Sequence, residues 1–293
     1  MSMKSADIAK RYRVDQPGRF KLKDFDPDDT AGLDRDKSEF KDMLKADAER
    51  LGKLQERLYA EGRWSVLMIL QGMDASGKDG IVNHVLSEID PQGCMVHSFK
   101  APNPEELAHD FLWRTTLRLP ERGRIGIFNR SYYEEVIVVR VHPEFLNGQK
   151  LPPPLVTDAI WKQRFEDIVA FERHLARNGT IVLKFFLNIS KKEQSKQLLQ
   201  RLDDPEKYWK FNRGDLKERA LWDKYMDAYE DAIRNTSHPD GPWYVVPSDY
   251  RSFSRLVVAA AMADAIERLN PKFPDLDEAT RAEMEEMKRQ LKG

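Results

Sequence analysis

Apolar and polar positions follow two different periods along the chain. Between residues 37 and 60 the apolar side chains recur at intervals of three and four, as Phe40, Met43, Leu44, Ala48, Leu51, Leu54 and Leu58. This spacing places them on one side of an α-helix, with charged residues opposite. It therefore predicts a long amphipathic helix that packs against the rest of the protein.

Beyond this helix, short apolar runs alternate with helical patterns. Strands are predicted over residues 65–71, 94–99, 124–128, 180–187 and 243–247. Several of these runs lack polar alternation, which indicates burial on both faces. Helices are predicted over residues 77–88, 104–119, 155–178, 191–202, 215–235 and 253–269. The alternation predicts an α/β fold, a parallel sheet between two layers of helices, with functional groups at the carboxyl ends of the strands.

The first part of the chain has a different character. Turn-forming segments such as Asp15-Gln-Pro-Gly18 and Phe25-Asp-Pro-Asp-Asp-Thr30 occur there with little periodicity. We expect an N-terminal arm over residues 1–33, lying on one domain over residues 34–293. The total of 293 residues is long for one ordinary domain and short for two large ones.

Composition narrows the class of protein. Hydrophobic residues make up 41% and charged residues 33% of the chain, as in soluble globular proteins. The most apolar stretches are far shorter than the roughly 20 residues of a membrane span, and the N-terminus has no apolar run, so a cytoplasmic location is expected. With 48 Lys and Arg against 49 Asp and Glu, the net charge of −1 gives no support for binding to nucleic acid or an acidic membrane. Any site for a polyanion must be local.

The strongest chemical signal is the segment Gly72-Met-Asp-Ala-Ser-Gly-Lys-Asp-Gly80, between the first predicted strand and a helix. It matches the G-x-x-x-x-G-K core of a P-loop, in which backbone amides and the helix N-terminus surround an anion and the lysine reaches the terminal phosphates. The alternative is a chance glycine turn. The predicted phosphate-binding residues of this loop are Gly72, Ala75, Ser76, Gly77, Lys78, Asp79 and Gly80.

One position departs from the common P-loop. Asp79 stands where a Ser or Thr normally binds Mg²⁺, so the metal must find another oxygen ligand. Asp74, inside the loop, is the candidate, because a carboxylate is a hard ligand that suits Mg²⁺. The alternative for Asp74 is a turn residue that bonds to its own backbone.

A second signal follows the third predicted strand, in Ile127-Phe-Asn-Arg-Ser-Tyr-Tyr-Glu-Glu135. P-loop folds often present an acidic metal ligand here. Instead the chain has Asn129, which can bind a phosphate or metal-bound water, and Arg130, which can hold a phosphate with its fork of donors. Glu134 and Glu135 follow within one helical turn. An ordinary solvated helix cap is the alternative.

A third signal is a basic and aromatic segment around residues 200–216, broken by Pro205 and Gly214. It resembles a mobile lid that closes positive charge over a polyphosphate and excludes water. The alternative is a solvated, charged helical hairpin. The predicted lid cations are Arg201, Lys207, Lys210 and Arg213.

Together these segments resemble the polyphosphate kinase 2 family, and within it the class III branch, over nearly the whole chain. The matching segments are Tyr12-Arg-Val14, Gly18-Arg-Phe20, Phe25 to Thr30, Gly72 to Gly80, Phe128 to Glu134, Lys184-Phe-Phe-Leu187 and Pro205-Glu-Lys-Tyr-Trp-Lys210. The resemblance implies a P-loop kinase fold similar to thymidylate kinase, a three-layer αβα sandwich with a helical lid. It also implies reversible transfer of the terminal phosphoryl group of inorganic polyphosphate to AMP or ADP, with Mg²⁺ or alternatively Mn²⁺.

The resemblance assigns roles to particular residues. Asp74, Lys78 and Arg130 match catalytic positions, and Asp74 also handles the metal. Asn129 and Glu134 match the nucleotide-binding Asn and Glu of class III. Relatives that act mainly on diphosphates carry Asp at the first of these positions, so Asn129 is the reason that AMP is expected beside ADP. Glu135 departs from the aspartate expected at its position. Adenine or guanine nucleotides and a homodimer or homotetramer are further expectations.

Two other functions are compatible with the same segments. An ATP-dependent nucleoside monophosphate kinase shares the fold, the loop and the lid. A noncatalytic nucleotide-sensing P-loop module would bind nucleotide without turnover, and Asp79 in place of Ser or Thr is the feature that favours it.

Overall fold

A five-stranded parallel sheet forms the centre of the computed structural model, which describes residues 5–34, 39–210 and 212–292. The strands lie in the order β2-β3-β1-β4-β5, and each neighbouring pair is parallel. Their bounds are β1 (Ser65–Gln71), β2 (Cys94–Ser98), β3 (Ile125–Asn129), β4 (Thr180–Asn188) and β5 (Trp243–Pro247). The five predicted strands are confirmed. Leu70 of β1 lies beside Asn129 of β3, so the P-loop and the second predicted signal start at the same edge.

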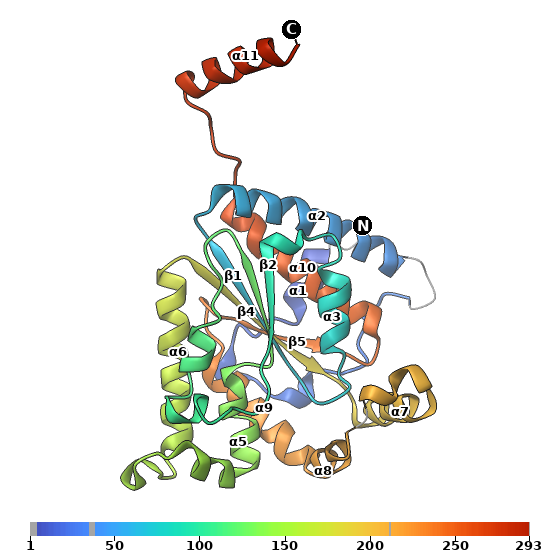
Figure 1. Ribbon diagram of the computed structural model, residues 1–293. Coiled ribbons are helices and arrows are strands. Elements are labelled where there is room, and N and C mark those ends of the chain that lie inside the picture. Colours follow the sequence, from blue (N-terminus) through green and yellow to red (C-terminus); the bar gives the residue numbers. More distant parts are fainter. Residues whose placement is uncertain (1–4, 35–38, 211, 293) are drawn as a thin grey trace.

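Helices cover both faces of this sheet (Figure 1). One face carries α1 (Ser5–Arg11), α2 (Glu39–Glu61), α3 (Lys78–Val85) and α10 (Arg251–Leu269). The other carries α5 (Val138–Val141), α6 (Ile160–Arg177) and α9 (Trp222–Thr236). In β1, Val66 and Met68 pack into the first layer while Leu67 and Ile69 pack into the second. Alternate side chains of a strand point to opposite faces, so burial on both faces produces the continuous apolar run seen in the sequence.

The remaining elements form the connections and the two ends of the chain. Short helices of the α type are α4 (Trp113–Thr116) and α8 (Gly214–Ala220), and longer ones are α7 (Lys191–Asp203) and α11 (Glu278–Lys292). The 3₁₀ turns are η1 (Pro17–Arg19), η2 (Leu22–Asp24), η3 (Pro91–Gly93), η4 (Glu106–Ala108), η5 (Tyr132–Glu135), η6 (Pro143–Gln149), η7 (Pro153–Leu155) and η8 (Pro205–Lys210). Among the described residues, no helix combines the length and apolar character needed to cross a membrane.

Several predicted helices are wrong in extent. The helix predicted over 155–178 begins only at Ile160, after the turn η7, and the helix predicted over 77–88 ends at Val85. The segment 104–119 forms only η4 and α4, because Asp110 breaks it: the Leu112 amide donates to Asp110 Oδ1 at 2.9 Å, a local bond that competes with helix formation. The segment 215–235 divides at Leu221 into α8 and α9. The predicted start of the first long helix, at Lys37, lies outside the described residues.

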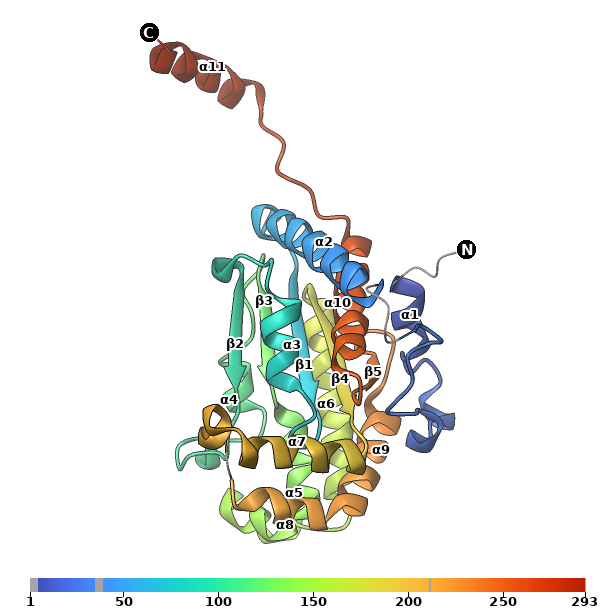
Figure 2. The same cartoon turned by 90° about the vertical axis from the view of Figure 1, so that its right-hand side faces the viewer.

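The N-terminal segment contains more regular structure than its sequence predicts. Helix α1 buries Ile8 and Ala9 against the layer that contains α10. The chain then runs antiparallel to β5, where the Val14 amide donates to Trp243 O at 2.9 Å and Tyr12 O accepts from the Val245 amide at 2.8 Å. This segment covers an edge of the sheet that would otherwise present unpaired backbone groups. At the other end of the chain, α11 stands away from the body and has no buried residues (Figure 2).

Candidate active site

The loop after β1 has the backbone shape that a P-loop requires. Gly72 has a φ of +153° and Gly77 a φ of +104°. At Gly72 a Cβ atom would lie 2.7 Å from Ser76 Oγ and 3.0 Å from Leu187 O, so only glycine fits. Helix α3 begins directly afterwards, at Lys78. The loop therefore turns the chain from the end of a buried strand into a helix N-terminus, the arrangement that favours anions.

Lys78 lies inside this loop. Its Nζ donates to Gly72 O at 2.6 Å and to Met73 O at 3.1 Å. Burial lowers the pKa of Lys78 to about 8, with the Asp74 carboxylate opposing this shift and the Arg130 guanidinium adding to it. At neutral pH the ammonium group is still largely protonated, and its charge is poorly solvated, which favours contact with an anion.

Arg130 connects the P-loop to the segment after β3. Its Nη2 lies 3.1 Å from Asp74 Oδ1 and its Nη1 lies 3.4 Å from Glu134 Oε2. The Glu134 carboxylate raises the pKa of Arg130, whereas burial opposes that shift. In return, burial raises the pKa of Glu134, and Arg130 and Lys78 oppose it. One guanidinium thus balances two partly buried acids at the edge of the sheet.

Asp79, the residue that replaces the usual Ser or Thr, joins three elements. Asn129 at the end of β3 donates through Nδ2 to Asp79 Oδ1 at 3.1 Å. Lys210 of η8 places Nζ 3.7 Å from Asp79 Oδ2. Asp79 therefore links α3, the end of β3 and the basic segment predicted to be a lid.

The basic segment crosses the carboxyl ends of the strands, where α7 and α8 lie in Figure 2. Three of its predicted cations, Arg201, Lys207 and Lys210, line the same crevice as the P-loop. The fourth, Arg213, is exposed at the start of α8 and is not among the residues that line it. Phe211, an aromatic member of the predicted lid, lies outside the described residues.

These groups surround a crevice of about 530 Å³. The lining residues are Asp74, Ala75, Ser76, Gly77, Lys78, Asp79, Gly80, Asn83, Asn129, Arg130, Gln197, Gln200, Arg201, Lys207, Lys210 and Arg251. Of the other residues predicted for the site, Gly72 lies at the base of the loop beneath Lys78, and Glu134 lies behind Arg130. The structure thus brings together three segments that are far apart in the sequence.

Arg251, Gln197 and Gln200 line the crevice without having been predicted, and Gln194 supports the loop from behind it. Arg251, in the first turn of α10, donates through Nη2 to Ala75 O at 3.3 Å and to Gln197 Oε1 at 2.7 Å. Gln194 donates to Asp74 O at 3.0 Å and so supports the loop from α7. Arg251 had a usable signal: it follows the fifth strand, and the carboxyl ends of parallel strands share one edge of the sheet. The glutamines gave no comparable signal.

Glu135 stands where the family resemblance implies an aspartate, and its side chain faces away from the crevice. Its Oε2 lies 3.3 Å from Arg164 Nη1 and accepts from Gln149 Nε2 at 2.5 Å. Both side chains of the Glu135–Arg164 pair are 5% exposed. Burial raises the pKa of Glu135, and Arg164 opposes this shift. Glu135 therefore braces the segment after β3 against α6.

The acidic side chains of the crevice suit a divalent metal that is shared with a substrate. Within the described residues, no group of three or more His, Cys, Asp or Glu side chains is placed to hold a metal ion together. Mg²⁺ in phosphoryl-transfer sites, however, is usually held by one or two carboxylates together with substrate phosphates and water. Asp74, whose side chain is 30% exposed at the crevice, fits that mode of binding.

Comparisons with known proteins agree with this geometry. The family model described as Polyphosphate kinase 2 matches residues 34–274. An ADP-polyphosphate phosphotransferase of Rhodopseudomonas palustris is 51% identical over 256 residues, covering 87% of this chain and 89% of that protein. An AMP/ADP-polyphosphate phosphotransferase of Meiothermus ruber is 46% identical over 271 residues, covering 92% of this chain and 97% of that protein.

Solved structures give the same result. The crystal structure of Polyphosphate Kinase 2 from Arthrobacter aurescens TC1 superposes with a TM-score of 0.86 at 43% identity, covering 95% of this chain and 96% of that one. Residues 34–274, which the family model matches, include the P-loop, the segment after β3 and the basic segment, so the likeness is not confined to the common P-loop core. On its sequence, its fold and the layout of this crevice, the chain belongs to the polyphosphate kinase 2 family.

Proposed function

We propose that the crevice transfers the terminal phosphoryl group of inorganic polyphosphate to AMP and ADP, reversibly and with a divalent metal. The relatives named above as polyphosphate phosphotransferases, similar over nearly their whole length, support this activity. The observation that carries the proposal for this chain is that the P-loop, Arg130 and three lid cations line one crevice. In a chain with a net charge of −1, the cations that line this crevice outnumber its two aspartates, Asp74 and Asp79, so the local charge suits a polyanion.

In this proposal one group of residues binds polyphosphate and another binds the nucleotide. Polyphosphate lies along the P-loop, where Lys78 and Arg251 meet the lid cations Arg201, Lys207 and Lys210. The acceptor phosphate lies by Arg130, with Asn129 and Glu134 on the nucleotide side. Phosphoryl transfer needs little covalent help from a protein, so these residues act by holding the reacting groups in line and by neutralising negative charge.

Asp74 would hold the divalent metal, Mg²⁺ or alternatively Mn²⁺. When bound, the ion would supply positive charge against the phosphate oxygens. The Arg130 guanidinium, 3.1 Å from Asp74, keeps this carboxylate directed toward the crevice. Closure of the lid segment then excludes water, which would otherwise compete with the nucleotide for the phosphoryl group.

A donor exchange tests the function. Purified protein is incubated with AMP or ADP and Mg²⁺, with either long-chain polyphosphate or ATP as donor, and nucleotide products are separated by chromatography. Turnover with polyphosphate is expected. Turnover with ATP and AMP alone would instead identify a nucleoside monophosphate kinase, and binding without turnover a sensing module.

Lys78→Ala tests whether the P-loop carries this reaction. Loss of the ammonium group from the phosphate cradle is expected to lower kcat by about 100- to 1000-fold. Lys45→Ala is the matched control, because the Lys45 side chain on α2 is 79% exposed and is not among the residues that line the crevice. Activity of Lys78→Ala equal to that of the control would refute the P-loop assignment.

Two properties stay as predictions. GMP and GDP in the same assay test the expectation that guanine nucleotides are accepted beside adenine nucleotides. Light scattering during gel filtration tests the expected homodimer or homotetramer.

A further inference from the structure

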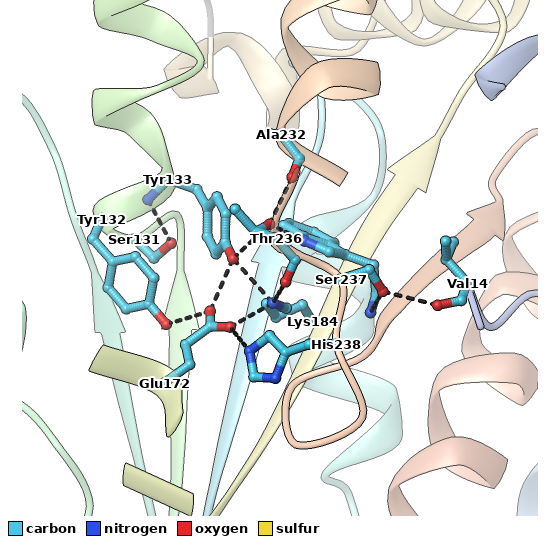
Figure 3. Close-up of polar contacts among 11 residues, drawn as sticks. Val14, Ser131, Tyr132, Tyr133, Glu172, Lys184, Ala232, Thr236, Ser237 and His238 are labelled. Atoms are coloured by element: carbon cyan, nitrogen blue, oxygen red, sulfur yellow. Dashed lines mark hydrogen bonds and ion pairs between the residues drawn. The ribbon is translucent and has the colours of Figure 1, made fainter. Parts of the chain in front are cut away.

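A fully buried ion pair connects helix α6 with strand β4. Glu172 of α6 and Lys184 of β4 are both 0% exposed, and Lys184 Nζ lies 2.5 Å from Glu172 Oε2. Figure 3 shows hydroxyl groups from two tyrosines converging on this pair. The residues that form hydrogen bonds with this pair are Tyr132, Tyr133, Thr236 and His238.

The ammonium group of Lys184 has an acceptor for each of its three protons. Besides Glu172 Oε2, these are Thr236 O at 2.7 Å and the Tyr133 hydroxyl at 3.0 Å. A charge can be retained in a protein interior only when its hydrogen bonds are completed in this way.

Both oxygens of the Glu172 carboxylate also accept hydrogen bonds. Its Oε1 accepts from the Tyr132 and Tyr133 hydroxyls, each at 2.9 Å. Its Oε2 is shared by Lys184 and by His238 Nε2 at 3.0 Å. Burial alone would raise the pKa of Glu172, but Lys184 and His238 hold it below its usual range, so the carboxylate is ionised.

The tyrosines belong to the same short turn as the crevice residues. Tyr132 and Tyr133 lie between Arg130 and Glu134, so one side of the turn meets the crevice and the other meets the buried pair. Arg130 has a φ of +65°, in the left-handed region that residues other than glycine rarely adopt. Such a conformation persists only where the surroundings fix it. One constraint is the bond from the Arg130 amide to Leu70 O at 3.0 Å.

We propose that Glu172 and Lys184 are positioning residues for phosphoryl transfer, which hold Arg130 and Glu134 in place through the hydroxyl groups of Tyr132 and Tyr133. This inference rests on the proposed function. The pair anchors a segment whose strained conformation directs a guanidinium at the reacting phosphates. A displacement of that guanidinium by about 1 Å is enough to lower the rate by about 100-fold.

A purely stabilising role is the competing explanation. It is a weak one, because well-packed apolar residues stabilise a core as well as a buried ion pair does. The two roles predict different kinetics. A stabilising pair affects the fraction of folded protein, whereas a positioning pair affects turnover by folded protein and acts through Arg130.

The variant Tyr133→Phe distinguishes the positioning role from the stabilising role, because it removes one hydroxyl and keeps the ring that packs on Trp243. Its kcat with polyphosphate and ADP is expected to fall by about 10- to 100-fold, while the KM for polyphosphate is unchanged. The same substitution is then made in Arg130→Lys, which keeps the charge but lacks the fork of donors. There it is expected to lower kcat by no more than about threefold, because the group being positioned is gone.

Tyr12→Phe is the matched control. It removes another buried hydroxyl that donates to a carboxylate, Asp29 Oδ2 at 2.8 Å, at the edge of β5. It is expected to leave kcat unchanged in both backgrounds. Thermal unfolding and near-ultraviolet circular dichroism are measured on every variant. If Tyr133→Phe does not fold, Tyr132→Phe takes its place, because among the described residues the Tyr132 hydroxyl bonds to Glu172 alone.

Equal losses of kcat in the native and Arg130→Lys backgrounds, or no loss in either, would overturn the positioning role. Either result leaves the proposed function standing, because the unsubstituted protein still turns over. Failure of the unsubstituted protein to use polyphosphate would instead refute the proposed function itself.

Discussion

At the scale of single residues, Lys78 shows how burial and anion binding act against each other. Its ammonium group is poorly hydrated inside the P-loop, and this lowers its pKa to about 8. Asp74 offsets only part of that shift. Bound phosphates would add negative charge beside the ammonium group and raise its pKa again. Lys78 is therefore more sensitive to pH in the free protein than in the complex.

The pH dependence of the reaction should reveal this residue. Below pH 8 Lys78 is protonated and attracts polyphosphate, and above it the charge is lost. The kcat/KM for polyphosphate, which reports the free protein, is expected to fall as pH rises through about 8. The fall in kcat, which reports the complex, is expected at higher pH. In Lys78→Arg the alkaline fall in kcat/KM should disappear, because guanidinium keeps its charge. Profiles that coincide for the two proteins would assign the titration to another group.

Asp74→Asn tests the metal role at the same scale. The amide keeps the size of the side chain but removes the charge that a divalent cation prefers. The Mg²⁺ concentration for half-maximal rate is expected to rise by at least about tenfold, since even residues that only support a metal ligand have effects of that size. Glu49→Gln on α2, 51% exposed, is the control for loss of an acidic charge. Mg²⁺ titrations that are the same for Asp74→Asn and the unsubstituted protein would remove Asp74 from the metal site.

At the scale of elements, the turn after β3 is fixed from two directions. Its tyrosines bond to Glu172 of α6, and Glu135 pairs with Arg164 of the same helix. Helix α6 is thus the support on which the crevice side of this turn depends. The two contacts differ in composition: the first is a network of hydroxyls and charges, the second a single buried ion pair with Gln149.

Breaking the second contact should be costly in stability. Arg164→Met leaves the Glu135 carboxylate buried without its cation, and the free energy of unfolding is expected to fall by about 3–5 kcal/mol. Urea titration followed by circular dichroism measures it. Lys162→Met is the control on the same helix: it removes a pair with Glu166 whose side chains are 82% and 66% exposed, and is expected to change stability by less than about 1 kcal/mol. Similar losses for the two variants would contradict a bracing role for Glu135.

The elements also show what the sequence can and cannot predict. Strands buried on both faces stand out as apolar runs, and the five predicted strands are present. The helix predicted over 104–119 failed because a side-chain bond at Asp110 outweighs a favourable pattern. The break at Leu221 left no mark in the apolar spacing. Local bonds and changes of direction are decided by geometry that periodicity does not record.

The candidate site also contains residues that the sequence predicts and residues that it does not. Gly72 to Gly80 and Asn129 to Glu134 are contiguous, and their chemistry is readable from spacing alone. Arg251 reaches Ala75 of the P-loop from a position 176 residues further along the chain. The partnership of Glu172 with Lys184 depends on how α6 packs against β4, which no local pattern specifies.

At the scale of the whole molecule, the distribution of charge matters more than its sum. The net charge is −1, yet Arg201, Lys207, Lys210 and Arg251 line one crevice together with Lys78. In the proposed function a long polyphosphate would meet this local field, whereas the molecule as a whole would give it no attraction. Its binding is therefore expected to depend on many weak contacts with partly exposed cations, which salt screens.

Ionic strength should separate the two substrates. The screening length falls from about 10 Å at 0.1 M salt to about 3 Å at 1 M, so the kcat/KM for polyphosphate is expected to drop by about tenfold or more over this range. The KM for AMP should change less, because AMP carries few charges and contacts few cations. Lys207→Ala with Lys210→Ala should lower kcat/KM at low salt and flatten its salt dependence, since two of the screened contacts are gone. The steady-state rates are measured in potassium chloride at fixed free Mg²⁺. A kcat/KM for polyphosphate that does not vary with salt would mean that the lid cations take no part in binding the polymer.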